Sequence, residues 1–271
     1  MKIYMTGTNG FIATRLRKFL PFTPIPRNIL YSQSLEAFVR RADVLIHMGS
    51  YGNNSWQSDE TEMLKANTLV TLLLLQLCRQ KKIGTFIFIG TSSEYGKKKI
   101  PMREDVALAP TTMYASTKAC GSLLTHEFAK HLTTVVVRPF SIYGEDEDDR
   151  KFIPTALRCL TNGQPFKLMK GTHDWVYVDD FCRAMILILK NSKKLSGDAV
   201  NIGTGIATTN ADVVRLLETI TGVKARTIHT PAKGQDSPLW VADNKKLRRL
   251  GWKPSVSLKQ GLEKIYEAKR T

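Results

Sequence analysis

The strongest constraint on the fold is an alternation of apolar strands and helices through the first half of this 271-residue chain. Strands that read as continuous apolar runs are typical of a parallel sheet buried on both faces. The expected strands span 2–6, 43–49, 85–90 and 134–139, and the expected helices 10–20, 58–81 and 113–131. The pattern predicts an α/β fold, a doubly wound parallel sheet with helices on both faces.

A glycine-rich turn, "TGTNGFIA", lies between the first strand and the first helix. Gly7 and Gly10 permit a tight turn and close approach of the backbone to a ligand, with Ala13 where a third glycine is often found. A turn of this kind at the start of a strand–helix–strand unit favours a pyrophosphate site. The sequence therefore predicts that a dinucleotide binds here.

The segment "FTPIPRNIL" (22–30), where the second strand is expected, indicates which dinucleotide is bound. An acid at the end of this strand suits the ribose hydroxyls of NAD, whereas arginine suits the 2′-phosphate of NADP. The segment contains Arg27 and no acid, which favours NADP and leaves NAD as the alternative.

The segment "YASTK" places Tyr114 and Lys118 four positions apart, on one face of the expected helix. A neighbouring ammonium favours the phenolate, so we expect Lys118 to lower the pKa of Tyr114 and make it an acid/base. The loop "GTSSEYG" supplies hydroxyls that could hold a substrate oxygen, from Thr91, Ser92 and Ser93. These groups should converge with the glycine turn at the carboxyl edge of the sheet.

Composition narrows the class of protein. The apolar run "LVTLLLLQLC" (69–78) is shorter than the roughly 20 residues of a membrane helix, and no secretory signal precedes the first strand. We expect a cytoplasmic protein without membrane insertion. Its four cysteines lack metal-type spacing, so we expect no metal and read them as reduced packing residues. The net charge of +16 could attract nucleic acid or a small polyanionic ligand.

In the order of its motifs the chain resembles the extended short-chain dehydrogenase/reductases, the NAD(P)-dependent nucleotide-sugar epimerase/dehydratase family. The landmarks are "TGTNGFIA", "DVLIHMGS", Asn67, "GTSSEYG", "YASTK", "VVVRPFSIYG", "DWVYVDDFCRA", "VNIGTG" and "LGWKP". The resemblance runs nearly end to end. It implies a dinucleotide-binding domain at 1–139 and mainly a substrate-binding lobe at 140–271, with segments near 175–203 returning to the sheet.

The resemblance also implies roles for individual residues. Tyr114 is then the acid/base and Lys118 its tuning residue, with Thr91 as the hydroxyl if the loop aligns without a gap and Ser92 if it aligns with one. The residues expected at the cofactor are Gly7, Asn9, Gly10, Phe11, Ile12, Arg27, Met48, Gly49, Ser50, Asn67, Lys118 and Pro139. The residues expected at a nucleoside-diphosphate sugar are Ser93, Ser141 and His173. A homodimer is also implied.

Three departures from the family pattern bear on function. The 16-residue step from Arg27 to Asp43 is compressed, so a strand with its helix can be missing between the second and fourth strands of the family fold. Ser141 stands where relatives usually carry asparagine, and His173 where arginine is common, so the sugar diphosphate can be held differently. Ser92 and Ser93 occupy the positions of the Asp-Glu pair that dehydratases use, which disfavours dehydration.

Hydride chemistry at sugar C4 remains. A 4-ketoreductase using NADPH is slightly favoured because of Arg27, and a 4-epimerase with tightly bound NAD is the alternative. A non-catalytic RNA-binding or regulatory protein is a third possibility. Nucleic-acid binding is not expected, because it would leave Tyr114, Lys118 and the hydroxyl loop without a role.

Overall fold

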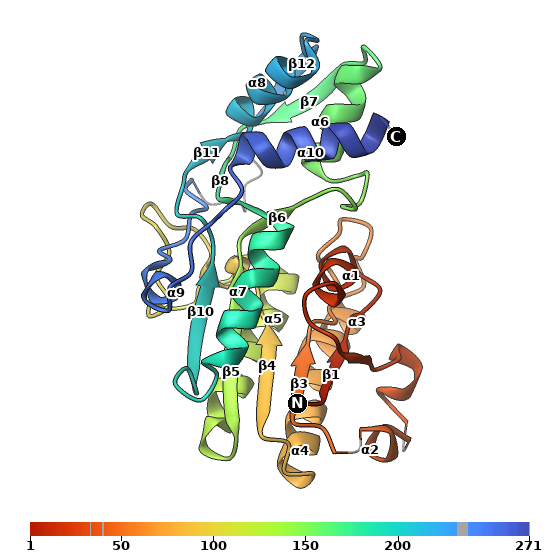
Figure 1. The fold of residues 1–271 in the computed structure, drawn as a ribbon, viewed down its shortest axis with the longest axis vertical. Coiled ribbons are helices and arrows are strands. Elements are labelled where there is room, and N and C mark those ends of the chain that lie inside the picture. Colours follow the sequence, from red (N-terminus) through yellow and green to blue (C-terminus); the bar gives the residue numbers. More distant parts are fainter. Residues whose placement is uncertain (33, 40, 232–237, 271) are drawn as a thin grey trace.

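The computed structural model describes residues 1–32, 34–39, 41–231 and 238–270, and a six-stranded sheet forms its centre (Figure 1). The strand order is β10-β5-β4-β3-β1-β2, and every neighbouring pair is parallel. The strands are β1 (Ile3–Thr6), β2 (Thr23–Pro24), β3 (Val44–His47), β4 (Thr85–Ile89), β5 (Thr133–Pro139) and β10 (Asp198–Ile202). The predicted α/β fold with a doubly wound parallel sheet is confirmed.

Helices cover both faces of the sheet. One face carries α1 (Phe11–Arg17) and α7 (Val178–Lys190), and the other carries α2 (Ser34–Phe38), α3 (Glu60–Leu64), α4 (Val70–Gln80) and α5 (Met113–Glu127). Because successive side chains of a strand point to opposite faces, Ile3 and Met5 join the core under α7, whereas Tyr4 joins the core under α4. Two apolar cores therefore fix the register of β1.

The compressed region predicted between the second and fourth strands is present. β2 has two residues, and one 3-10 turn (η1, Arg27–Ile29) and the short α2 lead from it to β3. Among the described residues the sheet ends at β2, one strand earlier than in the six-stranded dinucleotide fold with strand order 3-2-1-4-5-6.

Two helix boundaries differ from the sequence prediction. The first helix ends at Arg17 rather than at residue 20. The long helix expected at 58–81 is three consecutive segments, α3, a π-helical turn (η2, Lys65–Leu69) and α4. The π turn places Asn67 inward, where its side chain is fully buried. Such turns widen a helix locally and are frequent near functional sites.

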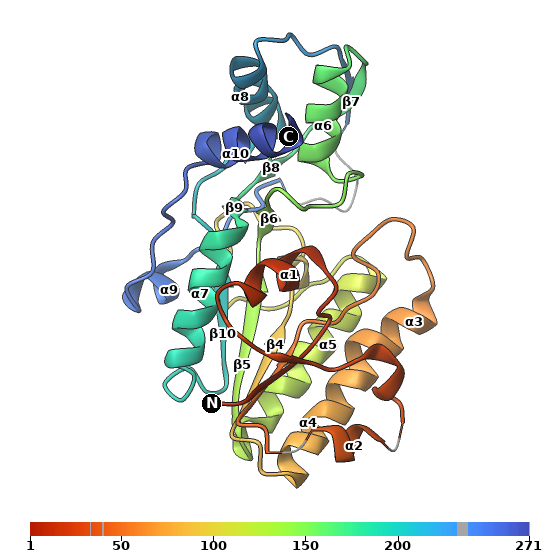
Figure 2. The same cartoon turned by 45° about the vertical axis from the view of Figure 1, so that its right-hand side comes forward.

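A second lobe lies above the sheet in Figures 1 and 2. It consists of β7 (Phe166–Met169) paired with β12 (Thr227–Thr230), and of α6 (Phe152–Thr161), α8 (Asn210–Thr221) and α10 (Leu258–Arg270). Two strand pairs connect the lobe to the sheet, β6 (Ser141–Tyr143) with β9 (Trp175–Tyr177) and β8 (Thr172–His173) with β11 (Thr208–Thr209). The last two helices are α9 (Lys245–Arg249) and α10.

Two further expectations can be compared with the structure. No helix within the described ranges has the length and apolar character needed to cross a membrane. All four cysteines are free, but Cys120 is exposed on α5, so the interpretation of all four as packing residues was wrong for this one. The other three are buried.

The tight turn after β1 predicts a matched pair of alanine variants. Gly7 has a φ of +71°, and a Cβ there would lie 2.5 Å from the Gly49 backbone nitrogen. Gly163 has a φ of +64° with nothing within 4 Å of a Cβ. Gly163→Ala should lower the free energy of unfolding by about 1 kcal/mol through backbone strain alone, and Gly7→Ala by at least about 3 kcal/mol. Equal losses in urea unfolding would contradict the close packing of the two turns.

Candidate active site

The residues predicted to bind a dinucleotide lie where β1 and β3 end. Gly49 donates its backbone N–H to the Thr6 hydroxyl at 3.1 Å, which holds the loop after β3 against the glycine turn. Gly10 is the N-cap of α1, and a Cβ built on it would have as its nearest neighbour the Gly7 carbonyl, at 3.6 Å. Packing within the chain therefore does not require glycine at position 10. The open backbone there fits a closely approaching ligand such as a pyrophosphate.

Six other predicted cofactor residues follow a strand or end one at this edge. Asn9 and Ser50 are exposed, and Phe11, Ile12, Met48 and Pro139 are half-buried. Asn67 bonds protein groups instead: its side chain bonds both backbone groups of Tyr51, at 3.0 and 2.8 Å, and the Thr117 hydroxyl at 3.0 Å. Asn67 thus joins the loop after β3 to α5.

Tyr114 stands in the first turn of α5, whose N-cap is Thr112. Its phenol is hydrogen-bonded to the side chain of Thr91, which follows β4 and is 9% exposed. Ser92 makes a different contact, because its hydroxyl accepts a hydrogen bond from the Trp240 indole at 2.7 Å. Of the two alternatives for the loop hydroxyl, the geometry therefore favours Thr91.

Lys118 is on the same helix but serves another group. It is 1% exposed, and its Nζ donates to the Ile89 carbonyl at 2.6 Å and lies 4.1 Å from the centre of the Phe88 ring. Burial lowers the pKa of Lys118 to about 8. The buried His47, also beside Phe88, has its pKa lowered to about 3 by burial and then by the Lys118 charge.

The expectation that Lys118 lowers the pKa of Tyr114 was wrong for this arrangement of side chains. Burial raises the pKa of Tyr114 well above its ordinary value, the hydrogen bond with Thr91 opposes that rise, and the Glu94 charge adds to it. Lys118 is not among these causes, since its ammonium is directed toward Ile89. The phenol is therefore protonated at neutral pH and is poised to donate.

Glu94 is a central residue that the sequence interpretation missed. It is fully buried and accepts hydrogen bonds from the Thr91 backbone N–H at 2.8 Å, the Ser122 hydroxyl at 2.7 Å and the Arg138 Nε at 2.8 Å. Arg138 also donates to the Tyr95 hydroxyl at 3.0 Å. The carboxylate thus fixes the hydroxyl loop from behind. The signal in the sequence was Arg138 itself, a charge within the apolar run "VVVRPF" that needs a buried partner.

Arg27, the residue that favoured NADP, lies on the exposed turn η1. Its side chain is 71% exposed, and its guanidinium donates to the Glu62 carboxylate of α3 at 3.2 Å. Lys65 bonds the other oxygen of Glu62, also at 3.2 Å. An acid supplied by α3 therefore lies beside the turn that follows β2.

The expected substrate residues lie between the sheet and the second lobe. Ser93 and Ser141 are half-buried, and Ser141 donates its backbone N–H to the Asp174 carbonyl at 3.0 Å. His173 is half-buried with its ring 5.4 Å from that of Trp175. The Asp174 side chain, missed in the sequence, is fully buried and accepts hydrogen bonds from Thr204, Gly205 and Ala242. It ties the turn after β10 to the strand that carries His173.

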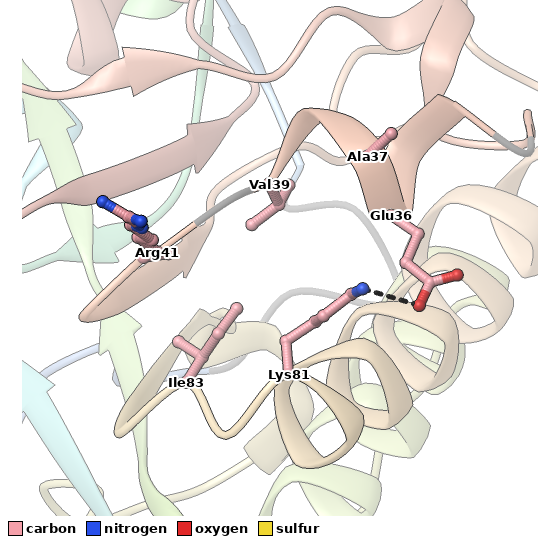
Figure 3. Close-up of a pocket in the computed structure, with 7 residues that line it drawn as sticks. Glu36, Ala37, Val39, Arg41, Lys81 and Ile83 are labelled. Carbon is pink, nitrogen blue, oxygen red and sulfur yellow. Dashed lines mark ion pairs between the residues drawn. The ribbon is translucent and has the colours of Figure 1, made fainter.

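A hollow of about 610 Å³ lies elsewhere on the molecule (Figure 3). It is bordered by Arg41 and Ala42 before β3 and by Lys81 and Ile83 before β4, and Lys81 pairs with Glu36 across it at 2.8 Å. These positions are at the amino ends of the strands. Ligands of open α/β sheets bind at the carboxyl ends, so this hollow is separate from the candidate site.

Comparisons with known proteins agree with this geometry. Residues 3–203 match the family model described as NAD dependent epimerase/dehydratase family. The chain is 29% identical to a Bacillus subtilis protein named "Uncharacterized UDP-glucose epimerase YtcB", over 97% of this chain and 96% of that protein. It is 25% identical to a GDP-6-deoxy-D-mannose reductase of Pseudomonas aeruginosa, over 97% and 95%.

A solved structure extends the likeness to the fold. UDP-glucuronic acid 4-epimerase from Bacillus cereus, in complex with UDP-glucuronic acid and NAD, matches with a TM-score of 0.92 and 27% identity. The match covers 100% of this chain and 99% of that one. The resemblance seen in the motifs of the sequence is therefore confirmed.

The buried ammonium of Lys118 predicts a pH dependence of stability. Its pKa is about 8 in the folded chain, against an ordinary value of 10.5, so between these values the unfolded state binds more protons. Stability attributable to this group therefore rises as pH increases from 8 to 10.5. Relative to Lys118→Met, the wild-type free energy of unfolding should gain on the order of 3 kcal/mol across that window. A difference that stays constant in urea titrations at pH 7.5 and 10.5 would contradict the assignment.

Proposed function

This chain belongs to the NAD dependent epimerase/dehydratase family, and we propose that it acts on C4 of a nucleoside-diphosphate hexose as an NAD-dependent 4-epimerase. The observation that carries the proposal is the hydrogen-bonded pair of Tyr114 and Thr91, at the same carboxyl edge of the sheet as the glycine turn. A phenol and a hydroxyl at the carboxyl edge of a dinucleotide-binding sheet can together bind one sugar oxygen and exchange its proton.

Each residue of the pair has a stated task in the proposed reaction. Thr91 Oγ1 accepts from the Ser93 backbone N–H at 3.2 Å, which orients it toward Tyr114. For oxidation the Tyr114 Oη must act as the phenolate, so the proton that burial keeps on it has to leave to solvent before the reaction begins. The phenolate then takes the proton of the C4 hydroxyl as that carbon becomes a ketone, and returns it when the ketone is reduced. Thr91 holds the same oxygen in both steps. After the sugar turns over in the site, reduction from the opposite face gives the epimer.

The dinucleotide supplies one element of chemistry when bound: it accepts the hydride from C4 and gives it back. Residues of this chain would hold it, with Gly7 and Gly10 at the pyrophosphate, Met48 to Ser50 along one side and Lys118 at the ribose. The open backbone at Gly10 fits such a group. Asn67 supports these contacts indirectly by anchoring Tyr51.

The pairing of Arg27 with Glu62 supports NAD rather than NADP. The sequence alone favoured NADP because Arg27 would be free to meet a 2′-phosphate. A carboxylate 3.2 Å from that guanidinium competes with a 2′-phosphate for it, whereas carboxylates accept hydrogen bonds from ribose hydroxyls. Tightly held NAD is what an epimerase requires, since the hydride returns to the same sugar.

A 4-ketoreductase is the second candidate. The chain matches the Pseudomonas aeruginosa reductase over nearly its full length, and burial keeps Tyr114 protonated, which suits reduction of a ketone. Dehydration has less support, because Glu94, the acid nearest the loop hydroxyl in sequence, is buried and committed to Arg138 and Ser122. The matching family model and the matching relatives carry the names of enzymes, so the RNA-binding alternative has no support from them.

The sugar diphosphate would be held at the junction with the second lobe. Ser141 and His173 occupy the two strand pairs that cross this junction, in place of the asparagine and arginine of the family pattern. Ser93 lies on the sheet side, next to the Thr91 loop. The half-buried imidazole of His173 offers one hydrogen-bond donor, whereas a guanidinium offers several. We therefore expect the diphosphate to be bound more weakly here.

Cofactor content and turnover test the function directly. Protein purified gently and then denatured should release NAD, and the holoprotein should interconvert UDP-glucose and UDP-galactose. Tyr114→Phe should keep the cofactor and lose at least about a hundredfold in turnover. Release of no nucleotide together with NADPH-dependent reduction of a 4-keto sugar would favour the reductase. Full activity in Tyr114→Phe would reject both candidates.

A second variant separates Thr91 from its neighbours. Thr91→Val keeps the shape of the side chain but removes the hydroxyl bonded to Tyr114, so turnover should fall about a hundredfold. Thr91→Ser restores the hydroxyl and should recover activity to within about tenfold. A Thr91→Val enzyme as active as wild type would show that another group holds the substrate oxygen.

We also propose a homodimer through α4 and α5. Leu69, the last residue of the η2 turn that leads into α4, and Leu73 on α4 are four positions apart on one face, 50% and 37% exposed, and Leu123 on α5 is 61% exposed. These two helices lie on the same face of the sheet, and a second copy presents the same apolar surface. The wild type should elute at twice its chain mass. The double variant that combines Leu69→Glu with Leu123→Glu should elute as a monomer. A monomeric wild type would reject this interface.

A further inference from the structure

Trp240 is an aromatic residue that reaches the hydroxyl loop from a distant part of the chain. Its indole Nε1 lies 2.7 Å from the Ser92 Oγ, although 148 positions separate the two residues. Its backbone N–H donates to the Thr172 carbonyl at 3.1 Å, and it pairs with His173 as a parallel bridge. Trp240 therefore joins the strand that carries His173 to the loop that carries Thr91.

The direction of this hydrogen bond is unambiguous. An indole N–H can only donate, so the Ser92 oxygen is the acceptor and its own O–H is left to donate elsewhere. Ser92 is 5% exposed. Within the part of the chain that the structure describes, its side chain has one hydrogen-bond partner, the Trp240 indole. A buried hydroxyl proton is unfavourable without an acceptor. The arrangement thus presents a fixed donor immediately after Thr91.

We propose that Trp240 is a positioning residue, which fixes Ser92 as a hydrogen-bond donor to the C6 oxygen of the sugar, on the group that the carbon next to C4 carries. The inference rests on the proposed function, because Thr91 and Tyr114 must hold the C4 oxygen for Ser92 to face its neighbour. It gives the two hydroxyls of the loop separate tasks. Thr91 serves the reacting oxygen, and Ser92 selects what stands beside it.

The surroundings of Trp240 narrow the class of sugar. The half-buried indole packs on an apolar cluster formed by Tyr95, Met102, Phe140 and Ala242. Arg138, a cation behind this wall, is 5% exposed and is committed to Glu94 and Tyr95. The carboxylate of a uronate would lose its hydration at this wall and would gain one hydrogen bond there, from the Ser92 hydroxyl. That exchange is unfavourable. The substrate class is a nucleotide sugar whose C6 group, carried by the carbon next to C4, is a neutral hydroxymethyl rather than the carboxylate of a uronate.

The indole resonances of the full chain test the Trp240–Ser92 contact without turnover. The chain has four tryptophans, so ¹⁵N-tryptophan labelling gives four side-chain signals that single Trp→Phe variants assign. Ser92→Ala should move the Trp240 signal by a few tenths of a ppm. Trp252 is the matched control, because its Nε1 donates to the Asp180 carbonyl at 3.1 Å away from the loop, and its signal should stay in place. An unmoved Trp240 signal would overturn the proposal.

Ligand additions to the NAD-loaded protein test the sugar contact. UDP-glucose should shift the Trp240 signal, whereas UMP, which lacks the sugar, should not. UDP-glucuronate should need at least about tenfold higher concentration for the same shift. Tighter binding of UDP-glucuronate overturns the neutral-sugar assignment. If neither sugar nucleotide moves any indole signal, the proposed function fails for these substrates, while Ser92→Ala still decides the Trp240 contact.

Kinetics distinguish a shared role from two independent ones. Trp240→Phe keeps a ring but removes the donor, and it should lower kcat/KM for UDP-glucose about fivefold to tenfold, as should Ser92→Ala. The double variant should be no worse than the poorer single variant. Trp252→Phe should match wild type. Multiplied losses in the double variant would mean that Trp240 does not act through Ser92.

Discussion

The buried carboxylate of Glu94 is the interaction on which the geometry of the site depends. It bonds the Thr91 backbone, the Ser122 side chain of α5 and Arg138 of β5, and so joins the three elements that surround Tyr114. The network continues from Arg138 through the Tyr95 hydroxyl to Asn201 of β10, at 3.0 and 2.7 Å. Buried ion pairs add little net stability, because desolvation offsets their attraction. Their consequence here is a defined position for the loop that carries Thr91.

Burial, rather than Lys118, sets the pKa of Tyr114. Desolvation disfavours the phenolate, and Thr91 offsets that effect only in part. The Lys118 ammonium donates to the Ile89 carbonyl and lies over the Phe88 ring, both at the end of β4. Its charge is therefore buried at the edge of the sheet and is directed away from the Tyr114 phenol. The site is therefore preorganised as a neutral donor pair. A proton that leaves Tyr114 for a developing alkoxide leaves a phenolate behind, which the hydrogen bond with Thr91 stabilises against the cost of burial.

Much of the fold could be predicted from the sequence, because its signals are local. Apolar runs gave the parallel sheet, and the short step from Arg27 to Asp43 gave the missing strand. The π turn at 65–69 had no such signal, since its apolar periodicity is that of a continuous helix. The site was predicted in part. Contacts between distant positions, such as Trp240 with Ser92 and Arg27 with Glu62, depend on tertiary packing that local patterns do not encode.

The central claim is that the pair of Tyr114 and Thr91 supports hydride transfer at C4 of a nucleotide sugar. The most direct measurement uses UDP-glucose deuterated at C4, with the isotope followed by mass spectrometry of the UDP-galactose formed. Because the hydrogen leaves and returns as a hydride within one active site, the product should retain the deuterium in ordinary water. Loss of the isotope to solvent would contradict the account, since it would mean removal of that hydrogen as a proton.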